Sequence, residues 1–307
     1  MKKFRYQCIS ICMILFSTLF VCGCSIPLPN STEQSAAFTP SSATANLYFF
    51  DVGQGDSTLI RLPSGATALI DAGPKSAADT LVNNLEKLGI QKIDLLIATH
   101  PHADHIGGMQ RIVQNFEIGE IYMPKIADNQ IPTTAAYTNF LKAVESKGLK
   151  INQAKAGTVI YQTENTTLEL LAPNSASYSN LNNYSVVTKL TYGNVRFLFT
   201  GDAEKESETE LLQNNYDLSC EVLKVGHHGS NTSTSNRFLT AATPKTAVIS
   251  CGQGNDYGHP HAELLKRLSS SNINVYRTDT GGTIAIETDG STYTVTENAL
   301  DTTKKAA

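Results

Sequence analysis

Cysteine is scarce in this chain beyond its first 24 residues, and that scarcity limits the ways in which a fold can be held together. Four of the six cysteines precede Ser25, which leaves Cys220 and Cys251. Two cysteines do not make a disulfide framework of the kind that holds small secreted domains. Both lie in apolar, strand-like segments, where cysteine behaves as a small hydrophobic residue. We therefore expect two buried free thiols and a fold that depends on its apolar core.

Long apolar runs are also missing after residue 21. No later run approaches the ~20 residues that a membrane-spanning helix requires, so the sequence offers no multi-helix channel. The one substantial run, Ile9–Val21, is 13 residues long and follows the basic segment MKKFRYQ. A basic start, a short apolar run and small residues after it are typical of a secretory signal peptide.

The segment Val21-Cys-Gly-Cys24 resembles the cleavage box of a bacterial lipoprotein. The resemblance implies removal of residues 1–23, a lipid on Cys24 and anchoring to a bacterial membrane outside the cytoplasm. A plain signal peptide and an uncleaved anchor remain alternatives. Residues 24–45 are rich in Ser, Thr, Pro and Ala, which cannot bury enough apolar surface to fold, so we expect a flexible tether. The folded domain is then expected at residues 46–298, with residues 299–307 as a disordered tail.

Positive charge is in deficit. The formal net charge is −4, and loss of Lys2, Lys3 and Arg5 with the signal peptide would make it −7. This balance excludes broad non-specific binding of nucleic acid, which is driven by lysine and arginine contacts to phosphate. It does not exclude an enzyme whose bound metal ions hold a phosphate group.

No segment repeats at a fixed period, and strand-like and helix-like segments alternate instead. Ser76–Leu88 has apolar residues at helical spacing, Ile93–Ala98 is a short apolar run typical of a buried strand, and Thr158–Thr200 is rich in strand patterns. We expect two β/α halves that divide near residues 165–184. The pattern predicts an α/β fold of the αββα four-layer sandwich type.

Histidine is the residue whose distribution carries the most information. The seven histidines fall in three short clusters: His100, His102 and His105; His227 and His228; His259 and His261. Neutral imidazole is the commonest metal ligand in proteins, and three clusters are hard to explain by chance. The sequence therefore predicts a metal site.

The first cluster follows the predicted strand Ile93–Ala98. Loops at the ends of parallel strands are where α/β folds place function. Ligands at i, i+2, i+4 and i+5 can present two pairs to two nearby metal ions. We expect His100 and His102 to bind one ion, and Asp104 and His105 to bind the other.

Three later segments add ligand-type residues. The apolar strand before Gly201 ends at Asp202, which can bridge two metal ions or cap the next helix; beside the upstream histidines we favour the bridge. One of His227 and His228 can complete the second metal, and the other can contact substrate. His259 is a candidate proton donor to a leaving group. His261 opens a predicted helix, where simple solvation is the stronger interpretation.

Together these motifs resemble the metallo-β-lactamase fold superfamily, and more closely the hydrolase domain of ComEC-type competence proteins. The matching segments are Phe50–Ser57 (FDVGQGDS), Ile70–Gly73 (IDAG), Thr99–Gly108 (THPHADHIGG), Asn182–Ser185 (NNYS), Phe199–Asp202 (FTGD), Leu223–Ser230 (LKVGHHGS) and Tyr257–Pro260 (YGHP). They span most of the predicted domain. The chain departs from full ComEC because it lacks a membrane channel, so a role in DNA uptake does not carry over automatically.

The resemblance implies two divalent metal ions, zinc or manganese. It places His100 and His102 on the first ion, Asp104, His105 and His228 on the second, and Asp202 between them; the choice of His228 over His227 stays open. The superfamily's further histidine on the first ion has no counterpart here. Asn182, Asn183 or Ser185 stands in that part of the chain, so we expect the first site to be weakly occupied.

The implied activity is hydrolysis of phosphodiester bonds by a hydroxide that two metals activate, with DNA as one candidate substrate. Candidate catalytic residues are Asp104, His227 and His259, and candidate substrate contacts are Asn183, Ser185 and Ser230. The loop Gly53–Ser57 either lines the pocket with backbone N–H groups or is a simple tight turn. Alternatives are a phosphoesterase of small or envelope-linked esters and a non-catalytic metal-binding lipoprotein. A β-lactamase is disfavoured by Asp202, where lactamases place Cys or His.

Overall fold

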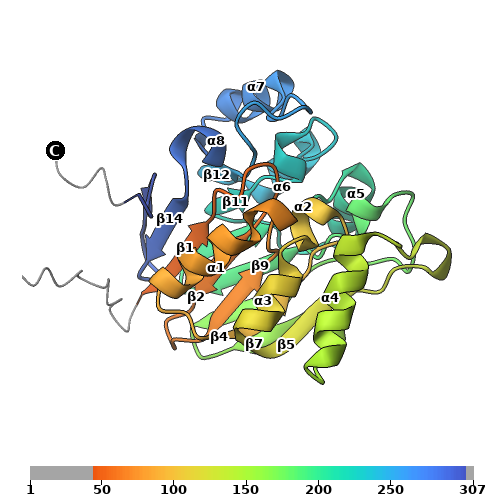
Figure 1. Ribbon diagram of the computed structural model, residues 1–307. Helices are drawn as coiled ribbons and strands as arrows, with labels where there is room; N and C mark the ends of the chain where they lie inside the picture. Colours follow the sequence, from red (N-terminus) through yellow and green to blue (C-terminus); the bar gives the residue numbers. More distant parts are fainter. Residues whose placement is uncertain (1–43, 302–307) are drawn as a thin grey trace, which may run out of the picture. The chain divides into compact units, whose positions relative to one another are not determined.

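A computed structural model describes residues 44–301 (Figure 1). The predicted signal peptide at residues 1–23, the lipidation site Cys24, the tether up to residue 43 and residues 302–307 lie outside the described part. Within residues 44–301, no helix combines the length and apolar character needed to cross a bilayer. Cys220 and Cys251 are buried free thiols, as the sequence predicts.

The first sheet has eight strands in the order β15-β14-β1-β2-β3-β4-β5-β6. Its strands are β1 (Ala45–Phe49), β2 (Thr58–Arg61), β3 (Thr67–Ile70), β4 (Lys92–Ile97), β5 (Glu117–Pro124), β6 (Ile151–Ala154), β14 (Ile284–Thr288) and β15 (Tyr293–Thr296). β3 to β6 run parallel, and the other neighbours pair antiparallel.

The second sheet has seven strands in the order β13-β12-β11-β10-β9-β8-β7. Its strands are β7 (Thr158–Gln162), β8 (Thr166–Leu170), β9 (Thr188–Tyr192), β10 (Val195–Phe199), β11 (Val222–Lys224), β12 (Thr246–Ile249) and β13 (Asn274–Arg277). β10 to β13 are parallel, and β7 to β10 form antiparallel pairs.

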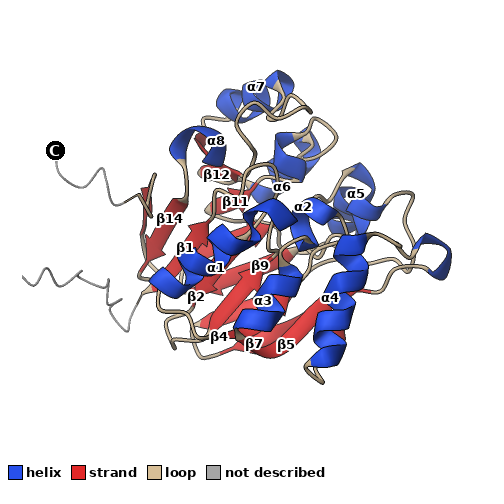
Figure 2. Ribbon diagram, in the orientation of Figure 1, coloured by secondary structure: helices blue, strands red, loops and turns tan. Residues whose placement is uncertain are grey.

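Helices cover the outer face of each sheet, which makes four layers (Figure 2). The first sheet packs against α1 (Ala78–Lys87), α3 (Met109–Asn115) and α4 (Ala135–Ser146), and the second against α5 (Lys205–Gln213), α6 (Asn236–Ala242) and α7 (Ala262–Ser270). The short helices α2 (Ala103–Ile106) and α8 (Thr278–Gly281) complete the set. This arrangement confirms the predicted αββα sandwich.

Alternation along β10 shows how the layers are built. Phe197 and Phe199 point into the core between the two sheets, and Leu198 points into the core under the helices. Successive side chains of a strand face opposite sides of its sheet. All three residues are almost completely buried, so β10 is an internal strand with apolar contacts on both faces.

The division between the halves differs from the sequence-based expectation. The chain passes from the first sheet to the second at residues 155–157, before the predicted boundary near 165–184. The hairpin β14–β15 then returns to the first sheet, where β14 pairs with β1. Local periodicity identifies a strand but does not show which distant strand it pairs with.

Polar residues follow the carboxyl ends of four parallel strands. Asp71 follows β3, the histidine loop follows β4, Asp202 follows β10 and His228 follows β11. Both sheets thus bring their ligand-type residues to one edge of the sandwich, which is where open α/β sheets bind ligands.

Candidate metal centre

The histidine loop after β4 turns into the one-turn helix α2, which begins after His102. His100 and His105 are fully buried, and His102 is half-buried. The loop is fastened to the turn after β3, because the backbone N–H of Ala72 donates to His105 O at 2.8 Å and that of Gly108 donates to Gly73 O at 3.0 Å. A side chain on Gly108 would collide with the carbonyl of Ala72, so glycine is required for this close approach.

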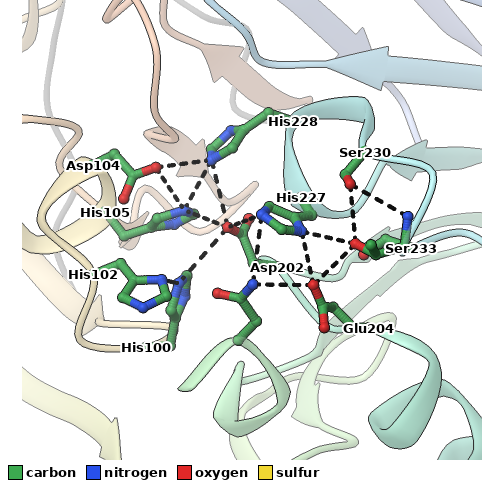
Figure 3. A network of polar contacts seen from close by, with 12 residues as sticks. His100, His102, Asp104, His105, Asp202, Glu204, His227, His228, Ser230 and Ser233 are labelled. Atoms are coloured by element: carbon green, nitrogen blue, oxygen red, sulfur yellow. Dashed lines mark hydrogen bonds and ion pairs between the residues drawn. The ribbon is translucent and has the colours of Figure 1, made fainter. Parts of the chain in front are cut away.

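Asp202 is the residue on which the other ligand-type side chains converge (Figure 3). Its Oδ2 lies 3.2 Å from His105 Nε2, 3.5 Å from His228 Nε2 and 3.7 Å from His100 Nε2. Its backbone N–H donates to Ser185 Oγ at 2.9 Å. Its Oδ1 is buried and has no hydrogen-bond partner among the described residues.

His227 and His228 are separated clearly by the structure. His228 is buried, and its Nε2 lies 3.1 Å from Asp104 Oδ2 and 3.3 Å from His105 Nε2. The His227 side chain is 23% exposed, and its Nδ1 lies 3.1 Å from Glu204 Oε1. The backbone of both histidines is left-handed, with φ of 50° and 53°, and the planes of the two rings make an angle of 64°.

Two groups of side chains have ligand atoms close enough together to hold an ion. One contains His100, His102 and Asp202; the other contains Asp56, His105, Asp202 and His228. Asp202 belongs to both, as expected of the bridging residue, and Asp104 lies beside the second group. Asp56 is a member that the sequence-based ligand set did not include.

The chemistry of this donor set fits divalent cations. His228 Nδ1 lies 3.1 Å from Ser250 O, and His105 Nδ1 lies 2.7 Å from Asp71 Oδ2. If each Nδ1 donates a hydrogen to its acceptor, the two Nε2 lone pairs face each other across 3.3 Å. Shared coordination of a cation resolves that repulsion. The unpartnered Asp202 Oδ1 supplies a further donor atom.

Asp71 holds His105 in place from behind. Asp71 accepts hydrogen bonds from Thr99 N at 2.8 Å and from Thr99 Oγ1 at 2.6 Å, and its carboxylate also bonds His105 Nδ1. A carboxylate behind a ligating histidine fixes the ring orientation and raises its basicity. Burial lowers the pKa of His105, but the charges of Asp202 and Asp71 outweigh it and hold the pKa well above its usual value.

Asp56 places a negative charge behind His228, although the hydrogen-bond partner of His228 Nδ1 is Ser250 O. Its Oδ1 lies 3.1 Å from His228 Nδ1, and its Oδ2 accepts from Lys224 Nζ at 2.6 Å. All three side chains are buried. Burial by itself raises the pKa of Asp56, but the positive charges of Lys224 and then His228 outweigh burial and lower the pKa to about 2. Asp56 is therefore an anion held between a fixed cation and the cluster.

Burial and neighbouring charges also shift the pKa values of the other side chains in the cluster. Burial, and the neighbouring His105, depress the pKa of His100, while burial depresses that of His102. Burial raises the pKa of Asp202, but His105 and His228 outweigh it and hold it well below the usual value. Burial lowers the pKa of His228, but Asp202 and Asp56 raise it to about 10.

The segment in which a further histidine is missing supplies Ser185. Its Oγ lies 3.4 Å from His100 Nδ1. Asn183 points elsewhere: its Oδ1 accepts from the backbone N–H groups of Glu204 and Ser207, which caps the start of α5. Asn182 Nδ2 lies 3.5 Å from His227 Nε2.

A cavity of about 420 Å³ opens beside the cluster. It is lined by Gln54, His102, Ala103, Asp104, Thr134, Asp202, His227, His228, Tyr257 and His259. The structure thus brings together the three candidate catalytic residues Asp104, His227 and His259. Asn183, Ser185 and Ser230 are buried and do not line this cavity, so their role as substrate contacts stays a prediction. The loop Gly53–Ser57 contributes Gln54 to the wall.

His261 has a structural contact instead. Its Nδ1 accepts from the backbone N–H of Asn231 at 3.0 Å.

Three supporting residues, Asp56, Asp71 and Lys224, had no assigned role from sequence. All three lie in motifs that carried the family resemblance, which was the available signal. Lys224 interrupts the apolar segment before Gly226, and a lone charge in a buried strand was the signal there.

Comparison with known proteins places this geometry in context. Residues 50–253 match the Metallo-beta-lactamase superfamily. The chain is 33% identical over 260 residues to ComE operon protein 3 of Bacillus subtilis, covering 79% of this chain and 33% of that protein. It is 31% identical over 237 residues to competence protein ComA of Neisseria gonorrhoeae, covering 76% and 31%. The chain therefore spans about a third of the length of these curated relatives.

A solved structure shows the same fold. Igni18, described as a novel metallo hydrolase from the archaeon Ignicoccus hospitalis, aligns with a TM-score of 0.51 at 17% identity, covering 79% of this chain and 98% of that one. The sequence match and the buried His/Asp cluster agree with that fold. The chain belongs to the metallo-beta-lactamase superfamily, as a metal-dependent hydrolase related to ComE operon protein 3 and to competence protein ComA.

Proposed function

We propose that this hydrolase cleaves phosphodiester bonds, with DNA as its substrate, and that it acts outside the membrane on a lipid anchor at Cys24. The observation that carries the proposed chemistry is the position of Asp202, whose carboxylate belongs to both ligand groups next to an open cavity. Two adjacent ions bridged by a carboxylate are a common arrangement for phosphoryl chemistry.

Divalent ions held by the two groups would polarise a phosphoryl oxygen and supply a nucleophile from water at neutral pH. The chain's own residues do the orienting. Asp71 and the carbonyl oxygen of Ser250 hold the rings of His105 and His228. Glu204 and Thr232 both lie 3.1 Å from His227 Nδ1, which leaves Nε2 directed toward Asp202 at 3.8 Å. We assign His227 and His259, on the cavity wall, to exchange a proton with the leaving oxygen.

The relatives support nucleic acid as the substrate class. One of them is named Competence protein ComA, and another, from Haemophilus influenzae, is named Recombination protein 2 and is 28% identical over 254 residues. Because the chain corresponds to about a third of the first two, we propose DNA cleavage as the shared step and make no assignment to the transport of DNA.

Hydrolysis assays test the proposal directly. The purified chain would be incubated with single-stranded DNA and with bis-p-nitrophenyl phosphate in the presence of Mn²⁺ or Zn²⁺. We expect turnover of both that is abolished by Asp202→Asn while the circular dichroism spectrum is unchanged. Absence of turnover with either substrate and either metal would contradict the proposal.

A non-catalytic metal-binding role is the second candidate, and one observation favours it. Ser185 lies beside His100 where the sequence lacks the further histidine, so the first ligand group has three members. Metal analysis after reconstitution, made alongside the hydrolysis assays, distinguishes the two: bound metal with no turnover of either substrate would favour the non-catalytic role.

The lipid anchor needs its own test. The full chain expressed in a bacterium and fed radiolabelled palmitate should incorporate label into the membrane fraction, and Cys24→Ala should not. Label retained in the Cys24→Ala variant would contradict lipidation at this residue.

A further inference from the structure

Tyr257 is an exposed aromatic ring at the edge of the catalytic cavity. It is 67% exposed, more than Ile131 and Val159, the other large hydrophobic residues that the described part of the chain leaves exposed. It lines the same cavity as Asp104 and Asp202. A single exposed ring has no functional meaning by itself, so the rigidity of its loop and the neighbours of the ring decide whether it forms a binding surface.

The loop that carries Tyr257 is held by the side chain of Asn255. Its Oδ1 accepts from the backbone N–H groups of Tyr257 at 3.1 Å and of His259 at 3.0 Å. Its Nδ2 donates to the carbonyl oxygens of Gly252 at 2.9 Å and of His259 at 2.6 Å. The half-buried amide of Asn255 therefore bonds both ends of the loop and restrains the backbone that carries the ring.

The Tyr257 ring also stacks on a neighbour. Its centroid lies 5.6 Å from that of His259, with an angle of 21° between the planes. His259 in turn lies 6.2 Å from His228, centroid to centroid, at 30°. Gln54 stands beside His259, with Nε2 3.5 Å from its Nδ1. A series of roughly parallel rings thus runs from the metal ligands to the surface, and the exposed Tyr257 is its outermost member.

The charges of the cavity limit what can bind there. Among the described residues that line it, none is lysine or arginine. Phosphates that flank the scissile bond therefore gain no ammonium or guanidinium contact on this wall. A planar nucleobase, in contrast, can stack on the exposed face of the Tyr257 ring. Aromatic stacking is the way in which proteins hold unpaired bases without regard to sequence.

We propose that Tyr257 forms a stacking subsite for the nucleobase next to the scissile phosphodiester, so that the preferred substrates are single-stranded nucleic acids or oligonucleotides. This inference rests on the proposed function. A base inside a duplex has both faces covered, so only an unpaired base can lie on the ring. Stacking of one base on an aromatic residue is worth about five- to a hundredfold in affinity.

Dinucleotides provide the test, because they have a single scissile bond. The substrates would be thymidylyl-thymidine and its two counterparts in which one thymine is replaced by hydrogen. The wild-type protein should show a kcat/KM about five- to a hundredfold lower for one of the two abasic compounds. In Tyr257→Ala this ratio should fall close to one, and in Tyr257→Phe, which keeps the ring, it should persist. Val159→Ala, at an exposed apolar position in the edge strand β7, is the control and should keep the wild-type ratio.

Binding without turnover provides an independent measurement. The Asp202→Asn variant should quench the fluorescence of a single DNA strand that carries 2-aminopurine. The double variant Asp202→Asn/Tyr257→Ala should quench it much less. Equal kcat/KM for all three dinucleotides, or a preference that survives in Tyr257→Ala, would overturn the stacking subsite and leave the hydrolase intact. Quenching that depends on Tyr257 without any hydrolysis by the wild type would support the subsite and overturn the proposed function.

Discussion

Lys224 Nζ lies 2.6 Å from Asp56 Oδ2, and both side chains are buried behind the metal cluster. The two residues are 168 positions apart in the sequence, so the ion pair joins the first sheet's loop to β11 in the second. Lys224 also donates to Val225 O at 3.0 Å. Because Asp56 in turn faces His228 Nδ1 at 3.1 Å, the pair connects the packing of the two sheets to the position of a candidate metal ligand.

Lys224→Met should destabilise the protein strongly. Removal of the ammonium leaves Asp56 as a buried anion with only His228 as a charged partner, and breaking a buried ion pair from one side typically costs about 3–5 kcal/mol. Urea denaturation at pH 7 measures the loss in the free energy of unfolding. The double variant Lys224→Met/Asp56→Leu should recover part of it, because no unpaired charge remains. A single variant as stable as the wild type would show that the ion pair has no structural role.

Asp71→Asn should weaken metal binding without unfolding the protein. The amide retains the size of the carboxylate but loses the charge that holds His105 Nδ1, and changes of this kind cost about 10–100-fold in metal affinity. Competition with a fluorescent chelator measures the affinity for Zn²⁺. Asp79→Asn is the matched control, because Asp79 is an exposed aspartate that pairs with Arg111 on the surface. Equal affinities for the two variants would rule out a role for Asp71 in orienting the ligand.

The local part of the site could be predicted from sequence because its residues are contiguous. His100, His102 and His105 share one loop, and an apolar strand before a loop is visible in the residue pattern. The αββα fold followed from the same alternation. The position of Asp202 could be predicted because a Gly-Asp pair follows an apolar strand. Gly201 has a φ of 50°, which the turn after the strand requires.

Contacts between distant segments could not be predicted. The Asp56–Lys224 pair and the return of β14 to β1 depend on which strands become neighbours, and periodicity carries no information on that. The assignment of His228 rather than His227 to the buried cluster involves a turn with two consecutive left-handed residues, which no local sequence pattern predicts. The contact of Asn183 with the start of α5 is likewise long-range, because its side-chain Oδ1 accepts from the backbone N–H groups of Glu204 and Ser207, 21 and 24 positions along the chain.

Two metal affinities should be resolved in a chelator titration. The group of His100, His102 and Asp202 has three members, whereas His105, Asp202 and His228 of the second group have the carboxylate of Asp104 beside them and the anion Asp56 behind them. More anionic donors bind a divalent cation more tightly, so one ion should be removed before the other. Atomic absorption after dialysis against graded chelator measures the steps.

Variants identify which group gives up its ion first. His100→Ala should abolish the weaker step and leave the tighter one, and His228→Ala should do the reverse. A single step for the wild type, or loss of both ions in His100→Ala, would contradict two separable sites.

Asp217→Asn should lower stability at neutral pH but not in acid. Lys189 is buried, and its Nζ lies 2.9 Å from Asp217 Oδ2. A hydrogen bond from Ser219, together with Lys189, lowers the pKa of Asp217 to about 2. A folded-state pKa below the unfolded value of about 3.9 means that the carboxylate stabilises the fold above pH 4. That contribution is lost as the pH falls toward 2.

The Asp217 side chain is 68% exposed, so solvent screening keeps the effect to on the order of 1 kcal/mol. Urea midpoints of the wild type and the variant should differ at pH 7 and converge near pH 2; a difference that persists in acid would mean that the charge of Asp217 is not its cause.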